Sequence, residues 1–170
     1  WEGTGEPLLK KGCEMGLEGV ISKDKLSPYA SGRSALWVKS KCIQGQEVII
    51  AGYTDPEGSR YGFGSLVLAA YAPDGELAYL GRVGTGFDRT KIAELLKKMR
   101  PLATRASPFR TKVPLQNRIH WVKPKLVAEI FFHGWTTDHH VRQAVFRDLR
   151  ADKPASQVTV DFELPSASLP

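Results

Sequence analysis

The stretch Phe63–Tyr71, FGSLVLAAY, is a long apolar run of the kind that forms a buried β-strand. The tight-turn sequence Pro73–Gly75 follows it, and Leu77–Val83 is predicted to be the other arm of a hairpin. On its amino-terminal side lies another strand-like run, Glu47–Tyr53, separated from it by the turn-forming residues Thr54–Gly62. Short strands joined by such turns predict a mainly β protein.

One amphipathic helix interrupts the strands. Asp88 is a suitable N-cap for a helix over Arg89–Arg100, and Pro101 ends it. Four apolar residues share one face of this helix by their spacing: Ile92, Leu95, Leu96 and Met99. The helix is therefore expected to cover one side of the sheet.

Further strands are predicted towards the carboxyl end. Trp121–His133 is either a strand pair or one long bent strand, with Val127–Phe132 as its buried part. Val145–Leu149 is a short run before a basic segment, and Val158–Phe162 is a candidate last strand. Five or six short strands with one inserted helix favour a small closed barrel. An oligonucleotide-binding (OB) barrel has this inventory, and an SH3-like barrel is the alternative.

The first 42 residues have a different organisation. A helix is expected over Glu6–Met15, ended by a left-handed Gly16, followed by strands at Leu17–Ser22 and Ala35–Cys42 with a loop at Leu26–Ser34. Such a segment buries too little surface to stand alone and needs a partner sheet. We therefore predict domains at 1–42 and 43–164 and a flexible tail at 165–170. Gln44–Gln46 is the predicted hinge.

Composition limits the classes of protein. The chain has 170 residues, 42% of them hydrophobic, and a net charge of +6, which favours a folded protein with a polyanionic partner or a solvated basic surface. No apolar run reaches the about 18 residues of a membrane span. The start at Trp1, with neither a leader nor an initiator Met, indicates a piece of a longer protein. Cys13 and Cys42 are expected to be buried and reduced, in keeping with a cytoplasmic location.

Two short segments near the start carry candidate site residues. Glu18 precedes Gly19, which has no side chain to prevent a close approach to a metal or a ribose; a surface carboxylate is the alternative. Lys39 and Lys41 would point to the same side of a strand. Two like charges on one face repel unless an anion lies between them, so a phosphate site is possible. An exposed lysine face is the alternative.

The segment 142–153 carries four cations, Arg142, Arg147, Arg150 and Lys153. Arginine can hold phosphate through two hydrogen bonds, and Asp152 could orient a neighbouring cation. As a charge run it could equally be a solvated face.

Two other patterns are weaker. Three histidines, His133, His139 and His140, do not have the spacing of a metal site. The sequence GRVGTG at 81–86 lacks the strand–helix context of a dinucleotide fingerprint, so a turn with positive-φ glycines is expected.

The ordered set EGVISK (18–23), WVKSK (37–41) and RQAVFRDLRADK (142–153) resembles motifs IV, V and VI of the covalent nucleotidyltransferases. The barrel sequence, including GYTDPEGSRYGFGSLVLAAY (52–71) and WVKPKLVAEIFF (121–132), is similar to the ligase module of the bacterial non-homologous end-joining ligases, the ligase D family. The resemblance runs from about residue 6 to 153. It implies an OB-fold barrel preceded by a fragment of the adenylation domain.

The resemblance also implies an activity. Such ligases seal 5′-phosphate/3′-hydroxyl breaks in double-stranded DNA through enzyme-adenylate and DNA-adenylate intermediates, using ATP and Mg²⁺ or Mn²⁺. By position, Glu18 resembles the motif IV carboxylate that helps hold the metal, and Lys39 and Lys41 resemble the motif V lysines near the α-phosphate. The motif VI groups that act on the departing β,γ-phosphates are matched by Arg147, Arg150, Asp152 and Lys153. The implied partners are nicked or broken DNA, the Ku protein, and polymerase and phosphoesterase modules, in the bacterial cytoplasm at the nucleoid.

Two departures from the family pattern matter. No Lys-x-Asp-Gly nucleophile motif occurs in the chain, since Ser22-Lys23-Asp24-Lys25 lacks the glycine. We therefore expect no self-adenylylation and no bound nucleotide in this chain alone. Ala144 replaces a proline common in motif VI, and only a small local change is expected. A non-catalytic OB-fold module that binds nucleic acid is the alternative function.

Overall fold

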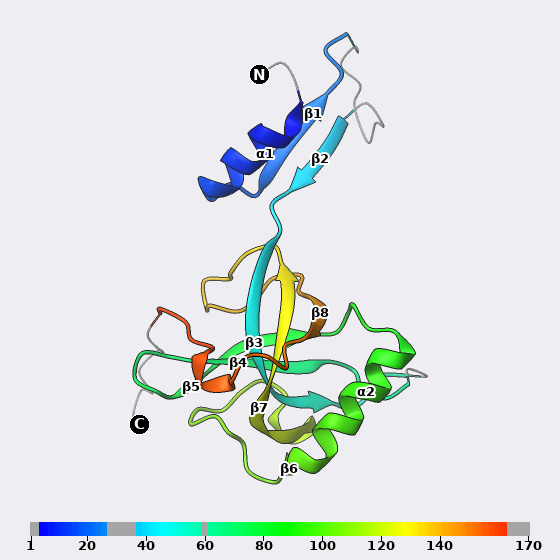
Figure 1. Cartoon of the computed structure of the whole chain (residues 1–170), viewed down its shortest axis with the longest axis vertical. Helices are drawn as coiled ribbons and strands as arrows, with labels where there is room; N and C mark the ends of the chain where they lie inside the picture. The colour runs from blue at the N-terminus through cyan, green and yellow to red at the C-terminus, as the bar shows by residue number, and fades with distance from the viewer. Residues whose placement is uncertain (1–3, 27–36, 59–60, 163–170) are drawn as a thin grey trace. The chain divides into compact units, whose positions relative to one another are not determined.

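The computed structural model describes residues 4–26, 37–58 and 61–162. The chain divides into two compact units, Trp1–Gln44 and Gly45–Pro170 (Figure 1). The division falls inside the predicted hinge Gln44–Gln46. The expected tail 165–170 and nearly all of the expected loop Leu26–Ser34 lie outside the described residues.

The first unit contains one helix and a two-stranded antiparallel sheet. Helix α1 (Gly5–Glu14) is followed by β1 (Gly19–Lys23) and β2 (Trp37–Lys41), close to the predicted helix and strands. Gly16 follows the helix with φ +76°, which confirms the predicted left-handed residue at its end. Several large apolar side chains of this unit remain exposed: Met15, Leu17, Ile21, Leu26, Val38 and Ile43.

The two cysteines form a disulfide, so the expectation of reduced thiols is wrong. Cys13 on α1 and Cys42 just after β2 are 29 residues apart in sequence, and their Cα atoms are 5.4 Å apart. The backbone N–H of Cys42 also donates to the carbonyl oxygen of Glu18 at 2.9 Å. Helix and hairpin thus pack so that two distant cysteines meet. Spacing alone could not reveal this, because the pairing depends on that packing.

The second unit is a curled antiparallel sheet. Its strands are β3 (Gln44–Thr54), β4 (Leu66–Tyr71), β5 (Leu77–Val83), β6 (Ala103–Thr104), β7 (Ile119–Phe132) and β8 (Val145–Leu149). They lie in the order β5-β4-β3-β7-β6, with β8 also paired to β7. Bulges interrupt the β3–β4, β4–β5 and β7–β8 registers and bend the strands. Two 2.9 Å hydrogen bonds, from Val141 N to Leu80 O in β5 and from Phe146 N in β8 to Thr85 O just after β5, join this edge of the sheet to the segment around β8. The mainly β architecture with two helices is as predicted.

Helix α2 (Arg89–Met99) begins where the sequence indicates. The Asp88 side chain accepts a 2.7 Å hydrogen bond from the backbone N–H of Lys91. Leu95 and Met99 are buried, and Ile92 and Leu96 pack against the core, which confirms the predicted apolar face. Between residues 61 and 162 the unit also has three short 3₁₀ helices: Arg100–Leu102, Gln116–Arg118 and Ala155–Gln157.

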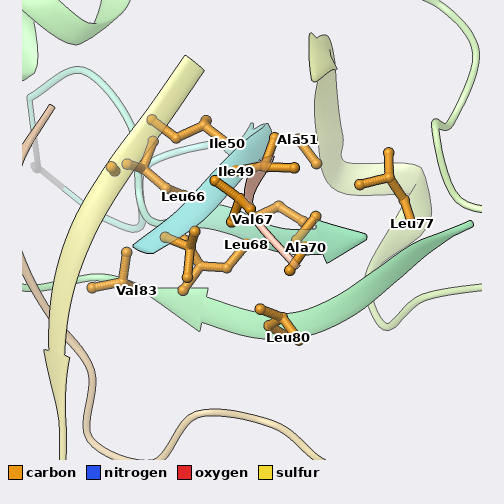
Figure 2. Packing of buried hydrophobic residues seen from close by; sticks show 14 of the residues in the cluster. Ile49, Ile50, Ala51, Leu66, Val67, Leu68, Ala70, Leu77, Leu80 and Val83 are labelled. Carbon is orange, nitrogen blue, oxygen red and sulfur yellow. The ribbon is translucent and has the colours of Figure 1, made fainter. Parts of the chain in front are cut away.

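Side chains from β3, β4 and β5 fill the centre of the second unit (Figure 2). Ile50, Leu68 and Leu80 have no exposed surface. Gly52 allows the close approach of β7 to β3, because a Cβ there would lie 2.8 Å from the carbonyl oxygen of His120. This core fixes the positions of β3, β7 and β8, which carry the charged residues described below.

One expected strand is not formed. Val158–Phe162 is not a strand, since its pairing is limited to an isolated bridge between Thr159 and Tyr71. Trp121–His133 was expected to be either a strand pair or one long bent strand, and it lies almost entirely within the single long strand β7. The predicted hinge segment Gln44–Gln46 forms the start of β3, and the residues outside strands between β2 and β3 are Cys42 and Ile43. None of the helices in the described part of the chain has the length and apolar character needed to cross a bilayer.

Candidate functional site

The candidate residues of the first unit meet on its hairpin. Glu18 immediately precedes β1, and its carboxylate lies 2.9 Å from the ammonium of Lys39 on β2. The β1–β2 register places Ile21 opposite Lys39 and Gly19 opposite Lys41. Glu18 and Lys39 therefore form an ion pair, and both side chains are about half exposed or more, at 68% and 49%.

Gly19 explains how the strands come so close beside Glu18. A Cβ at this position would lie 2.3 Å from the carbonyl oxygen of Ser40. Any other residue would push β1 away from β2 and separate Glu18 from the lysine strand. From the sequence, Gly19 was expected to let a metal or a ribose approach Glu18 closely. In the structure, the group that approaches Gly19 closely is the backbone of β2.

This hairpin could take part in holding a phosphate-bound divalent metal. Mg²⁺ is commonly held by one or two carboxylates, with phosphate and water oxygens as its remaining ligands. Glu18 offers one exposed carboxylate, and Lys39 beside it supplies a cation for phosphate. Among the described residues no group of three or more His, Cys, Asp or Glu side chains gathers as a complete protein metal site.

The basic segment of the second unit runs along β8 and into the turn after it. Arg147 lies in β8, Arg150 follows the strand, and Lys153 lies three residues further on. The backbone of β8 is fixed by its pairing with β7 and by the hydrogen bond from Phe146 to Thr85. Gly86 next to it allows this packing, because a Cβ there would lie 2.2 Å from the carbonyl oxygen of Phe146.

Each cation of this cluster contacts a carboxylate. Arg147 lies 2.7 Å from Glu129 on β7, and its guanidinium sits 4.9 Å from the ring centroid of Phe131. Arg150 lies 3.0 Å from Glu47 on β3. Lys153 contacts the other oxygen of the same Glu47 carboxylate.

Asp152 orients Arg150, as the sequence suggested. Its two oxygens accept hydrogen bonds of 2.9 and 2.8 Å from Nε and Nη2 of Arg150. These bonds lower the pKa of the Asp152 carboxyl to about 2, and they raise the pKa of the Arg150 guanidinium above its usual value. Both groups therefore remain charged throughout the physiological range.

Three cations, Arg147, Arg150 and Lys153, thus face three carboxylates, Glu47, Glu129 and Asp152. A hollow of about 340 Å³ lies at this cluster and is lined by Gly45, Gln46, Glu47, Glu129 and Arg150. These cations can bind an anion if one of the carboxylates leaves its ion pair. Arg142 contributes through its backbone, which pairs with His133 and Gly134.

Glu47 and Glu129 were not singled out from the sequence as candidate site residues. Glu129 has a recognisable signal, because it is the one charge in the apolar run Val127–Phe132 of β7. Glu47 stands at the polar beginning of a strand, where a carboxylate is unremarkable by pattern. Their roles emerge only when three strands are brought together.

The sequence does not predict a metal site at the histidines or a dinucleotide site in the glycine-rich segment. In the structure these residues have other contacts. His139 stacks on Phe162 with ring centroids 4.1 Å apart, and His140 meets Tyr79 edge-on. Gly81 lies in β5 and Gly86 beyond it, with φ of +101° and +91° as expected for glycines that adopt positive φ.

Comparison with known proteins gives consistent matches. The family model described as "ATP dependent DNA ligase C terminal region" matches residues 59–153. The chain is 44% identical over 156 residues to the multifunctional non-homologous end joining protein LigD of Pseudomonas aeruginosa, covering 89% of this chain and 19% of that protein. It is 44% identical over 160 residues to the corresponding repair protein of Mycobacterium tuberculosis, covering 92% of this chain and 21% of that protein. The chain thus spans about a fifth of these curated relatives.

Solved structures agree with these matches. The ligase domain of M. tuberculosis LigD matches with a TM-score of 0.66 and 40% identity, over 94% of this chain and 53% of that one. A mycobacterial DNA ligase D complexed with ATP and MES matches with a TM-score of 0.62 and 39% identity, over 92% of this chain and 51% of that one.

Proposed function

The chain belongs to the family of ATP-dependent DNA ligase C-terminal regions, and from this premise we propose that it is the phosphate-handling and DNA-gripping part of an end-joining DNA ligase. The whole enzyme would seal 5′-phosphate/3′-hydroxyl breaks in double-stranded DNA through enzyme-adenylate and DNA-adenylate intermediates. The observation that carries the proposal is the cation cluster of Arg147, Arg150 and Lys153, built on β8 of an OB-type sheet.

We assign the domains as in the sequence interpretation. Residues 1–42 would be the end of the adenylation domain with motifs IV and V, and residues 43–164 the OB domain with motif VI. The division of the chain between Gln44 and Gly45 supports a boundary there. Movement of the OB domain about this boundary would bring motif VI to ATP in the first step and leave the domain free to hold DNA in later steps.

The roles of the side chains follow from their charges. In the first unit, Lys39 and Lys41 would contact the α-phosphate of ATP beside the Glu18 carboxylate. In the second, Arg150 and Lys153 would stabilise the negative charge that builds up on the departing β,γ-phosphates. Asp152 would keep the Arg150 guanidinium in a fixed orientation through its two hydrogen bonds. Arg147 would add charge from the same strand.

ATP and a divalent metal, Mg²⁺ or Mn²⁺, are the proposed cofactors of the whole enzyme. A related ligase D is described in complex with ATP, which supports the nucleotide. Glu18 would hold the metal together with phosphate oxygens, and the metal would neutralise phosphate charge. The absence of a Lys-x-Asp-Gly motif supports the prediction that this chain alone forms no adenylate.

Nicked or broken duplex DNA is the proposed partner, with Ku and the polymerase and phosphoesterase modules as partners of the whole enzyme. The names of the relatives, multifunctional end-joining proteins, support this assignment. The proposal places the protein in the bacterial cytoplasm at the nucleoid, in keeping with the bacterial relatives and a DNA substrate. The net charge of +6 suits a polyanion.

A non-catalytic OB module is the alternative, and the same net charge favours it. The two functions differ in where anions bind. Inorganic tripolyphosphate should bind at motif VI if the cluster handles triphosphate, and on any basic surface if the module is only a DNA binder.

The test compares two double variants of equal charge, Arg150→Ala/Lys153→Ala and Lys97→Ala/Lys98→Ala on α2. Tripolyphosphate affinity is measured by calorimetry, and nicked-duplex affinity by fluorescence anisotropy over a salt series. The proposal expects the motif VI variant alone to lose tripolyphosphate binding. Equal losses of tripolyphosphate affinity in both variants would favour the simple binding module. A DNA affinity that does not change with salt concentration would contradict both functions.

A further inference from the structure

The carboxylate of Glu47 occupies the space between two cations of motif VI. One oxygen lies 3.0 Å from Nη1 of Arg150, and the other contacts the ammonium of Lys153. A carboxylate that bridges two cations in this way takes the place of a phosphate group, since both present two negatively charged oxygens to paired donors. Glu47 therefore occupies the same hydrogen-bond donors of Arg150 and Lys153 that a triphosphate would need.

This bridge is partly shielded from solvent. The side chains of Glu47, Arg150 and Lys153 are only 24%, 35% and 29% exposed. Ion pairs with less water around them are stronger and less screened than surface pairs. An anion must therefore displace Glu47, and not merely add to an exposed positive surface.

The other two carboxylates of the cluster differ in what they bind. Asp152 is two residues from Arg150 in sequence and holds it through a local bidentate pair. Glu129 contacts Arg147. Among the three carboxylates of this cluster, Glu47 is the one that contacts both Arg150 and Lys153, and it comes from β3, about a hundred residues earlier in the chain.

From this geometry we infer that Glu47 acts as a gate. Its carboxylate competes with anions for Arg150 and Lys153 and closes the motif VI anion site until a polyphosphate displaces it. The inference rests on the proposed function, because it assumes that Arg150 and Lys153 bind the phosphates of ATP. Glu47 would act as a positioning residue. It holds Lys153 close to Arg150, which lines the 340 Å³ hollow, and it prevents weaker anions from binding to the two cations.

The experiment measures the affinity of this chain for inorganic tripolyphosphate by calorimetry. Glu47→Gln keeps the shape of the side chain and removes its charge. One charge-assisted hydrogen bond corresponds to roughly ten- to a hundredfold in a binding constant. We expect Glu47→Gln to bind tripolyphosphate about tenfold more tightly than the unmodified chain.

Matched variants separate the gate from a general change in charge. Glu76→Gln changes the net charge equally, but its partner is Arg110, at 3.4 Å, so little gain is expected. Glu129→Gln breaks the ion pair with Arg147 and removes only a longer-range charge interaction with Arg150, so it should give a smaller gain than Glu47→Gln. Adding Arg150→Ala to Glu47→Gln should abolish the gain.

The outcomes also separate the gate from the proposed function. If Glu47→Gln binds no more tightly than the unmodified chain, or if Glu76→Gln gains as much, the gate is overturned while the motif VI site stands. If Arg150→Ala leaves tripolyphosphate binding unchanged in both backgrounds, the gate and the motif VI assignment fail together. Loss of the gain when Arg150→Ala is added places it at this site, so a purely structural role for Glu47 would not reproduce the expected result.

Discussion

Reduction of the Cys13–Cys42 disulfide should selectively destabilise the first unit. The bond closes a loop of about 30 residues, from a sequence separation of 29. In the chain-entropy model, a loop of this length contributes about 3–4 kcal/mol by restricting the unfolded chain. That is a large contribution for one short helix and a two-stranded sheet, which bury little apolar surface of their own.

Hydrogen exchange with mass spectrometry can measure this effect strand by strand. Because about 1.4 kcal/mol corresponds to tenfold, amides of β1 and β2 should exchange about a hundred- to a thousandfold faster after reduction or in Cys13→Ser/Cys42→Ser. Amides of β4 and β5 belong to the second unit and serve as the internal control. Alkylation of the thiols reports the fraction reduced.

Unchanged protection of β1 and β2 in fully reduced protein would refute the reasoning, because the crosslink would then add nothing to the packing of α1 on the hairpin. Rapid alkylation of both cysteines without reductant would refute the pairing itself. In a reducing cytoplasm the bond would open, so the reduced form is the relevant one for the proposed location.

Three further predictions concern the second unit. Gly86→Ala should lower the free energy of unfolding by about 2–4 kcal/mol, measured by urea titration, because its Cβ would meet Phe146 at a φ of +91°. Leu68→Ala should lower it by about 2–5 kcal/mol in the same assay, because the Leu68 side chain has no exposed surface; a loss below about 1 kcal/mol would contradict the core placement. The pKa of Asp152 is lowered by Arg150 to about 2, so the stabilisation from this pair is complete above the ordinary aspartate pKa and is lost as the pH falls towards about 2. NMR titration of the carboxyl should show that low pKa, and Arg150→Ala should raise it towards the usual range near 4.

Local chemistry made much of the second unit predictable. Strand β5 and the capped helix α2 follow from apolar periodicity and from Asp88, features that short segments carry by themselves. The end of α1 was predictable from Gly16 for the same reason. Each depends on neighbours in sequence and not on the rest of the fold.

The features that the sequence did not predict correctly involve contacts between residues that are far apart in the chain. Val158–Phe162 has the composition of a strand, but only Thr159 finds a bridge partner, on Tyr71. The Cys13–Cys42 bond depends on how α1 packs on the hairpin. The resemblance identified Arg150 and Lys153, whereas their neutralisation by Glu47 required β3 and β8 to be placed together.

The site was predictable only in part for the same reason. The order of the motif-like segments pointed to Lys39, Lys41, Arg150 and Lys153 as candidate phosphate ligands, although charge alone also allowed a solvated basic surface. They did not indicate that Lys39 would pair with Glu18, or that Arg147 would pair with Glu129. Those pairs decide how readily an anion can enter, and they are set by strand register.

Intact mass spectrometry of the purified chain, before and after incubation with ATP and Mg²⁺, tests the central claim most directly. The account predicts an unchanged mass, because the chain has segments that resemble motifs IV, V and VI but no Lys-x-Asp-Gly nucleophile motif. The addition of one adenylyl group would contradict it, since a lysine of this chain would then be the nucleophile.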